Sequence, residues 1–370
     1  MGAYIVKRLL LMIPTLFGIM LMTFAIIQFV PGGPIERIIA QIQGTAVSAT
    51  ARIGGESGGE AGRSPDAGGI GESSVAVKYR GAQGLDPEFI KKLEVQFGFD
   101  KPAHERFFLM MKNYLTFNFG ESYFRDKPVV DLMIEKMPVS ISLGLWLTFL
   151  TYAVSVPLGI RKAVKDGTPF DVWTSGAIII GYAIPSFILA VLLIVLFAGG
   201  SYFSWFPLRG LTSDNFDQMT FIEQIGDYAW HLVLPLTALG IGGFATMTLL
   251  TKNSFLDEIK KQYVVTARAK GLSDRRVLYG HVFRNAMLLV ISGFPGAFLS
   301  AFFTGSLLIE QIFSLDGLGL LTYTAAVNRD YPVFFADLYV FTLVGLVVAL
   351  ISDLTYTWID PRIDFEAREL

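Results

Sequence analysis

Six long apolar runs, separated by polar segments, dominate the chain. A helix needs about 20 apolar residues, at about 1.5 Å each, to cross a hydrocarbon core of about 30 Å. The runs cover residues 9–30, 137–160, 172–200, 231–251, 285–309 and 338–358. Segments in lipid must satisfy their own backbone hydrogen bonds, and the period-2 alternation of a β-barrel is absent. We therefore expect an all-α integral membrane protein with six transmembrane helices rather than a large soluble core.

The first run has two interpretations. Lys7 and Arg8 precede it, as basic residues precede the apolar part of a secretory signal peptide. The run is longer than such an apolar part, however, and it ends at Pro31 without a small-residue cleavage site. We expect a retained first helix.

Basic residues are distributed unevenly over the connecting segments. The segment between the fourth and fifth runs carries eight of them and the loop after the second run carries three, whereas the two intervening loops carry one each. Cytoplasmic loops are enriched in Lys and Arg, so this pattern predicts that both termini are cytoplasmic. The acidic loops then face the outside.

The predicted domain organisation follows from these runs. Residues 1–30 form the N-terminal transmembrane helix, and residues 31–136 form a large extracytoplasmic insertion. Residues 137–358 form a core of five transmembrane helices with a cytoplasmic loop at 253–284, and residues 359–370 form a cytoplasmic tail. Within the insertion, residues 44–84 are rich in glycine and too poor in apolar side chains to offset their ordering entropy. They are expected to be flexible and to serve as a spacer, as a lid or as a contact for a binding protein.

Residues 85–136 are expected to form a small helical cap. Asp86, Pro87 and Glu88 are typical of a helix start, and Gly98 can end that helix. A second amphipathic helix is predicted over 103–115, and a third helix is predicted to start at Pro128.

Composition narrows the chemistry. Charged residues make up 17% of the chain against about 25% in a soluble domain. The net charge of −2 gives no indication of nucleic-acid binding. With no cysteine and three scattered histidines, we find no metal-ligand cluster and no catalytic motif, so no metal and no catalytic residue are predicted.

The cytoplasmic loop is longer than a linker requires. Its pattern predicts one helix over 256–269, a stop at Gly271, and a second helix over 274–283 capped by Ser273. A basic helix at the inner face can bind anionic lipid heads. The compact small-residue turn that ends at Gly271 instead favours insertion into a pocket on another protein.

This turn, Thr266-Ala267-Arg268-Ala269-Lys270-Gly271, resembles the EAA-type motif of ABC importer permeases. His281-x-Phe283-Arg284-Asn285 is similar to its continuation in the oligopeptide and dipeptide permease family. Further segments also resemble motifs of that family: Arg8-Leu9-Leu10, Ile13-Pro14-Thr15-Leu16, Pro31-Gly32-Gly33-Pro34, Phe119-Gly120-Glu121-Ser122 with Pro128-Val129, Ile184-Pro185-Ser186-Phe187, Gly317-Leu318-Gly319, Arg329-Asp330-Tyr331-Pro332 and Asp360-Pro361-Arg362. The glycine-rich insert, the 101–106 segment and the 210–214 run resemble those of a branch that imports peptides and the peptide-nucleotide antibiotic microcin C.

The resemblance implies the type I ABC importer permease fold and a function as one permease subunit of an ATP-driven peptide importer. The implied partners are a second permease subunit, ABC ATPase subunits that bind ATP and Mg, an extracytoplasmic peptide-binding protein and the lipid of the bacterial inner membrane. The loop is implied to dock on the ATPase. Val265 stands where the motif usually has an acid, so no ionic contact is expected there. The predicted coupling residues are Tyr263, Val264, Thr266, Ala267, Arg268, Ala269, Lys270, Gly271 and Leu272.

A second set of residues has either a pathway role or a helix-packing role. Four small residues at four-residue spacing on the fifth run would let helices approach closely. Pro185 interrupts the third run, as a hinge or a static kink. Asp353 is the one ionisable residue that the pattern places well inside a span, either for transport or for pairing with another helix. The set is Pro185, Gly293, Ala297, Ala301, Gly305 and Asp353.

Two other functions compete with an ABC permease. A secondary transporter would carry several intramembrane ionisable residues and an internal repeat, and neither is evident. A membrane enzyme would carry a catalytic constellation. The sequence also lacks the Gly-x-x-x-x-Gly-Lys-Ser/Thr loop, so any ATPase is expected on partner subunits rather than on this chain.

Overall fold

The computed structural model describes residues 2–30, 32–42, 87–200, 202–297 and 307–359. Within these ranges the chain is helical, and the only β structure is one antiparallel bridge between Glu121 and Pro128. The chain divides into two compact units. One unit comprises residues 1–8, 138–319 and 345–370, and the other comprises residues 9–137 and 320–344. The glycine-rich stretch 44–84 lies outside the described residues.

Five described helices are long and apolar enough to cross a membrane. They contain three of the six predicted runs entirely (137–160, 231–251 and 338–358), all but the last residue of the first run, and residues 285–297 of the fifth run. The helices are α1 (Gly2–Phe29), α6 (Val129–Val164), α9 (Phe221–Ile259), the stretch Asp274–Ala297 that includes α12 (Phe283–Ser292), and α16 (Tyr331–Ile359). Their apolar side chains remain exposed over much of α1 and α6, as expected for surfaces that face lipid. The predicted all-α membrane fold is therefore confirmed.

The third apolar run is two helices rather than one straight helix. α7 (Pro169–Ala183) and α8 (Ser186–Phe197) meet at a bend of 97°, so the chain has six candidate spans if this pair counts as one. Pro185 causes the break because it lacks an N–H and disfavours a helical conformation at Ile184. Ile184 is indeed extended, with φ −86° and ψ 119°.

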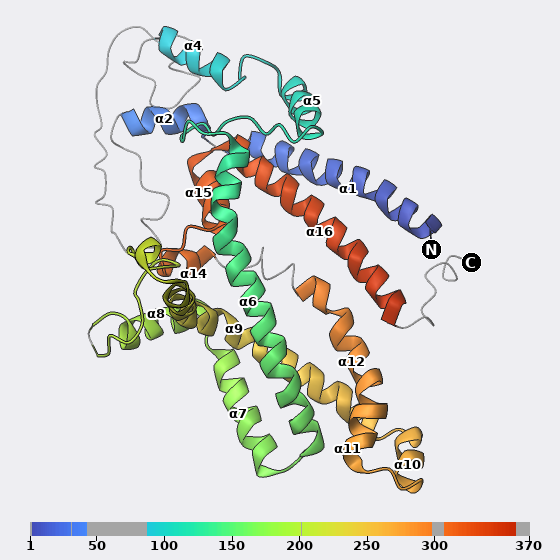
Figure 1. Cartoon of the computed structure of the whole chain (residues 1–370). Helices are drawn as coiled ribbons and strands as arrows, with labels where there is room; N and C mark the ends of the chain where they lie inside the picture. The colour runs from blue at the N-terminus through green and yellow to red at the C-terminus, as the bar shows by residue number, and fades with distance from the viewer. Residues whose placement is uncertain (1, 31, 43–86, 201, 298–306, 360–370) are drawn as a thin grey trace. The chain divides into compact units, whose positions relative to one another are not determined.

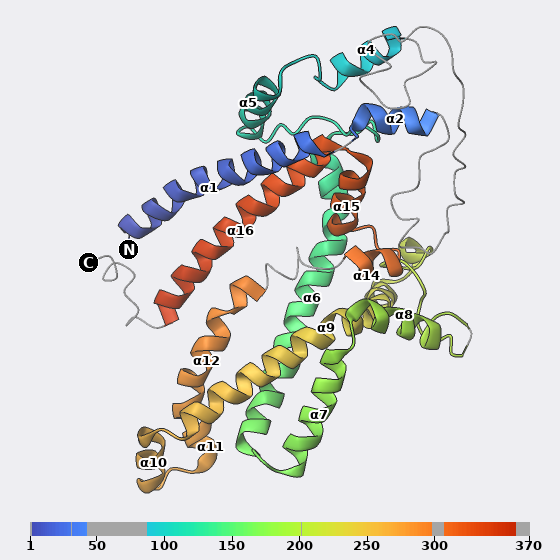
Figure 2. The ribbon, with the colours of Figure 1, turned by 180° about the vertical axis from the view of Figure 1, so that it is seen from behind.

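The unit that contains α6 to α12 is organised around α9. α9 packs on α7, α8 and α12, and Figures 1 and 2 show it crossing α6. Thr220 and Glu223 form a capping box at its start, since the Glu223 carboxylate accepts hydrogen bonds of 2.8 Å from the Thr220 amide and hydroxyl. The short helix α14 (Leu307–Ile312) contributes Ile309 to a core that also includes Leu232 and Ala190.

The other unit contains the predicted cap helices. α4 (Pro87–Gln96) and α5 (Ala103–Tyr114) occur where the sequence predicts them, and Gly98 has φ +72° after α4. An additional helix, α2 (Pro34–Ile42), packs Ile35 and Ile39 against α4. The third predicted cap helix is not separate, because Val129 begins α6 and the helix continues without a break.

Two family motifs meet within this second unit. Asp330, between α15 (Leu318–Asn328) and α16, accepts hydrogen bonds from the Ser122 hydroxyl and from the Tyr123 amide at 3.0 Å. Burial raises the pKa of Asp330, and the two donors oppose that rise. This contact fixes the loop before α6 to the start of α16.

A buried charge cluster joins α6, α7 and α9. The Lys162 side chain is fully buried, and its ammonium lies 2.9 Å from Asp171 Oδ1. It also donates to the hydroxyls of Thr174 and Ser175 at 2.7 and 2.8 Å. Lys252 of α9 lies 2.7 Å from the other oxygen of Asp171. One carboxylate thus neutralises cations from two other helices. We call these three residues, Lys162, Asp171 and Lys252, the Asp171 clamp.

Asp171→Ala is expected to lower the free energy of unfolding by about 3–5 kcal/mol, because it leaves the buried Lys162 without its counter-charge. The measurement is thermal unfolding of the detergent-solubilised protein. Asp166→Asn is the matched control, since Asp166 also pairs with Lys252 but is 48% exposed. Equal stability of the two variants would show that the clamp does not hold these helices together.

Candidate functional site

The predicted cytoplasmic loop forms a bent helical element. α9 ends at Ile259, and α10 (Gln262–Ala269) begins after a break at Lys260 and Lys261. A turn through Gly271 leads into α11 (Asp274–Val277) and a π-helical turn over Leu278–Val282, which enters α12. The first predicted helix, 256–269, is therefore two helices, because α9 extends farther than its apolar pattern. We call residues 262–277 the elbow.

Gly271 has the left-handed conformation that the sequence predicts, with φ +81°. The Gly271 amide donates to Arg268 O at 2.9 Å, and the Leu272 amide donates to Ala267 O at 3.3 Å. These bonds satisfy carbonyl groups at the end of α10, as in a Schellman-type cap. A Cβ on Gly271 would meet nothing within 4 Å, so only the backbone conformation opposes a side chain there. Ser273 precedes α11 in an extended conformation, without a side-chain capping bond.

The inner face of the elbow is buried. Val264 is 0% exposed, Ala267 7% and Val277 2%, and all three belong to one core with Phe255 of α9 and Met287 of α12. The Ser254 hydroxyl of α9 also donates to Ala286 O of α12 at 2.6 Å. The elbow is thus packed directly onto two membrane helices, α9 and α12.

The outer face of the elbow is exposed. Thr266, Arg268, Ala269 and Lys270 all face solvent, and Val265 is 54% exposed. Arg268 donates to Asp274 Oδ1 at 3.1 Å across the turn. This face therefore presents a small apolar spot with basic neighbours, which suits docking into a groove on another protein.

Two features stiffen the connections on either side. Tyr263 donates its hydroxyl to Glu258 Oε2 at 2.7 Å. Burial raises the pKa of Tyr263, so this phenol stays protonated and remains a donor. On the other side, the π-helical turn closes with the Phe283 amide bonding to Leu278 O. Single π turns inside helices are frequent at functional sites.

The structure divides the predicted coupling residues between two roles. Val264 and Ala267 are buried and anchor the elbow, whereas Thr266, Arg268, Ala269, Lys270 and Gly271 are exposed. Tyr263 and Leu272 are partly buried and pack against the same core. The predicted set omits Val265, which is exposed on the outer face. The helical period could have identified it, because in a helix that buries positions 264 and 267, position 265 points outward.

The predicted pathway residues lie on several elements, and the Ser352 hydroxyl donates to Ser292 O at 3.3 Å, so the residues next to Asp353 and Gly293 are in contact. Pro185 lies at the bend between α7 and α8, and Gly293 follows the last residue of α12. The Ala297 amide donates to Gly293 O at 2.9 Å within one helical turn. Ala301 and Gly305 lie outside the described residues.

Asp353 is paired rather than isolated. Its Oδ2 lies 2.6 Å from Arg8 Nη2 and accepts a hydrogen bond of 2.8 Å from the Tyr4 hydroxyl. α1 and α16 lie side by side where these residues meet (Figures 1 and 2). The geometry supports a pairing of helices for Asp353.

The expectation that Asp353 is the one ionisable residue inside a span is wrong. Asp337 lies within the candidate span Tyr331–Thr355 and is 0% exposed. It accepts a hydrogen bond of 2.8 Å from Thr322 Oγ1. The sequence analysis missed Asp337 because the last apolar run was taken to begin at Leu338. The helix α16 begins seven residues earlier, at Tyr331.

Comparison with known proteins identifies the relatives of this chain. A family model described as "Binding-protein-dependent transport system inner membrane component" matches residues 155–365. The chain is 67% identical over 370 residues to the peptidoglycan transport system permease protein YejB of Agrobacterium fabrum, with all of both chains covered.

Other relatives cover the chain equally well. It is 57% identical over 368 residues to the inner membrane ABC transporter permease protein YejB of Escherichia coli O157:H7, with all of both chains covered. It is 30% identical over 366 residues to the oligopeptide transport system permease protein AppB of Bacillus subtilis, covering 99% of this chain and 100% of the relative. The resemblance to the oligopeptide and dipeptide permeases, and to the YejB branch among them, is confirmed.

The two faces of α10 predict opposite mutational behaviour. Val264→Ala removes two fully buried methyl groups and is expected to lower the free energy of unfolding by about 1–3 kcal/mol. Val265→Ala, at the next and exposed position, is expected to change it by less than about 0.5 kcal/mol. Thermal unfolding in detergent compares the two variants. A larger loss for Val265→Ala would reverse the assignment of the faces.

Proposed function

The chain belongs to the family of binding-protein-dependent transport system inner membrane components and is the permease component of an ABC peptide transporter. From this premise we propose that it forms half of a translocation path. We further propose that the elbow couples this path to ATP hydrolysis. The other half comes from a second permease subunit. Hydrolysis of ATP with Mg takes place on the ATPase subunits, since the sequence of this chain has no phosphate-binding loop. The elbow then faces the cytoplasm, as the basic residues predict.

The observation that carries this proposal is the two-faced elbow. Its outer face, with Val265, Arg268 and Lys270, is exposed and suits a groove on the ATPase. Its inner face is packed into the core that α9 and α12 share. A displacement of the ATPase is therefore transmitted through Val264, Ala267 and Val277 to membrane helices. In this mechanism, nucleotide-driven closure of the ATPases changes the tilt of the helices that line the path.

The substrate class follows from the relatives by analogy. The relative that shares 67% of its residues with this chain is named a peptidoglycan transport permease, and more distant relatives are named oligopeptide and dipeptide permeases. We propose that this importer takes short peptides released from peptidoglycan. Microcin C, a peptide joined to a nucleotide, is the second candidate substrate.

The coupling role is tested at Gly271. Gly271→Val forces a β-branched residue into the left-handed region at a cost of roughly 1–2 kcal/mol, which displaces the turn. Peptide uptake by cells that express the complete importer is expected to fall by about tenfold. ATP hydrolysis is expected to continue and membrane insertion to remain normal.

Gly271→Asn is the matched control, because asparagine tolerates this conformation and no atom obstructs its Cβ. It should retain most of the uptake. If Gly271→Val imports peptide at the parental rate, the elbow does not couple the ATPase to transport.

The substrate proposal is tested by competition. A labelled tripeptide that carries the D-glutamate and diaminopimelate residues of peptidoglycan is expected to be imported, and excess trialanine should compete with it poorly. The measurement is uptake into cells that express the complete importer. Equal competition by trialanine would indicate a general oligopeptide importer instead.

A further inference from the structure

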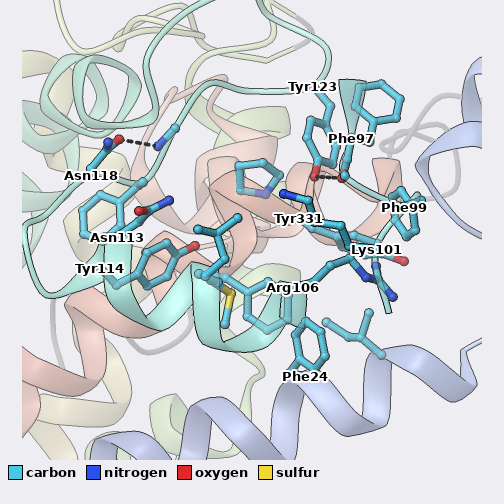
Figure 3. Close-up of a pocket in the computed structure, with 18 of the residues that line it drawn as sticks. Phe24, Phe97, Phe99, Lys101, Arg106, Asn113, Tyr114, Asn118, Tyr123 and Tyr331 are labelled. Carbon is cyan, nitrogen blue, oxygen red and sulfur yellow. Dashed lines mark hydrogen bonds between the residues drawn. The ribbon is translucent and has the colours of Figure 1, made fainter. Parts of the chain in front are cut away.

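A pocket in the unit that contains α2, α4 and α5 has no role in the coupling mechanism. Its volume is about 230 Å³. The wall is formed by the end of α1, the segment after α4, α5, the loop before α6 and the start of α16 (Figure 3). All of these parts belong to the same compact unit. The positive-inside pattern predicts that residues 31–136, which supply most of this wall, lie on the extracytoplasmic side, where substrate arrives.

The pocket is cationic. Lys101 and Arg106 line it, and the described residues of its lining include no aspartate or glutamate. The Arg106 guanidinium lies 4.5 Å from the centre of the Phe99 ring and 5.9 Å from that of Phe24. Its Nη2 donates to Gln28 Oε1 at 2.9 Å. Stacking on two aromatic faces holds this positive charge at a fixed place in the wall.

The pocket also contains polar groups without partners. Among the described residues, the Tyr114 hydroxyl, the Asn113 side-chain amide and the Lys101 ammonium make no hydrogen bond. The Tyr114 side chain is 3% exposed, and in Figure 3 its hydroxyl points toward the middle of the pocket. Burial raises the pKa of Tyr114, so the phenol stays protonated and can donate. Buried polar groups normally have partners, so the buried Tyr114 hydroxyl is suited to a ligand with acceptor oxygens, and Asn113 and the exposed Lys101 can donate to the same ligand.

The remaining wall is aromatic and rigid. Tyr114 packs edge-on against Phe119 at 4.8 Å and against Tyr339 at 5.4 Å between ring centres. The Tyr123 hydroxyl donates to Phe97 O at 3.4 Å, which holds the segment after α4 against the loop before α6. Such walls favour an apolar side chain beside the charged group.

We propose that this pocket binds the carboxylate-bearing end of a short peptide, with Lys101, Arg106 and Tyr114 at the carboxylate and the aromatic wall at the adjoining side chain. The inference rests on the proposed function, since it assigns a substrate subsite to the same importer. The volume is below the roughly 300–1,000 Å³ of pockets that enclose whole drug-sized ligands, so only one end of the peptide enters. Peptidoglycan peptides, which are rich in carboxylates, fit this chemistry.

Binding to the purified complex in nanodiscs of neutral phosphatidylcholine tests the proposal. The probe is a fluorescent tripeptide with a free C-terminal carboxylate, compared with the same tripeptide amidated at its C-terminus. Neutral lipid excludes competition by anionic headgroups. The free acid is expected to bind about tenfold more tightly, because the amide loses the charge-assisted contacts.

Two variants locate the binding. Lys101→Gln and Tyr114→Phe each remove one donor and should weaken binding of the free acid by about 2- to 12-fold, the loss of one hydrogen bond. Binding of the amidated peptide should change less in Lys101→Gln. Lys112→Gln and Tyr339→Phe are the matched controls, since neither residue lines the pocket and each loses the same group.

Three outcomes overturn the proposal: equal affinity for acid and amide, parental affinity in both pocket variants, or equal losses in the controls. Peptide uptake measured with the same variants separates this failure from failure of the proposed function. If the parental complex imports peptide while the pocket variants bind as the parent does, only the subsite is wrong. If the parental complex imports no peptide, the proposed function itself fails.

Discussion

Backbone N–H and C=O groups that enter a lipid bilayer have no water to bond, and the rest of this structure depends on that constraint. It makes each apolar run helical, and it makes every interruption of a helix costly unless protein covers it. The bend at Pro185 is such an interruption. Ile184 leaves the helical conformation there, and α8 turns away from α7 and packs on α9 with Ala190 in a buried core.

The same constraint governs the charges. A charged side chain inside a span is stable only with a partner, so each of those described here is neutralised or hydrogen-bonded by another helix. Asp171 joins two lysines, Asp353 joins Arg8 and Tyr4, and Asp337 accepts from Thr322. These contacts hold helices together and do not by themselves indicate ion transport. This arrangement agrees with the membership in a family of ATP-driven importers.

The elbow and the pocket divide the proposed work of the subunit. The elbow combines one exposed face with one buried face, so force applied by a partner reaches α9 and α12 through packed side chains. The pocket combines fixed cations with unbonded donors, which suits recognition of a carboxylate. The elbow belongs to one compact unit and the pocket to the other. A substitution in one of them therefore does not directly alter the residues of the other.

Local patterns determined much of this protein. Length and apolarity fixed the spans, the αL requirement at Gly271 fixed the turn, and Asp86, Pro87 and Glu88 fixed the start of α4 near residue 87. These features depend on neighbours in sequence, so the sequence alone predicts them. The motif around Ala267 likewise indicates the family, because it is a run of consecutive residues and needs no long-range contact to be recognised.

Only the tertiary structure decided which side chains meet. The Asp171 clamp joins residues 81 positions apart, and the pocket assembles residues from Phe24 to Phe335, so neither has a local signature. The start of α16 at Tyr331, which places Asp337 inside a span, was also missed, because an acid interrupts the apolar pattern even where a threonine from another helix donates to it. The sequence by itself determined the helices and the family. Long-range packing decided which charges are paired, which face of the elbow is exposed and where a ligand can bind, because those depend on atoms brought together from distant parts of the chain.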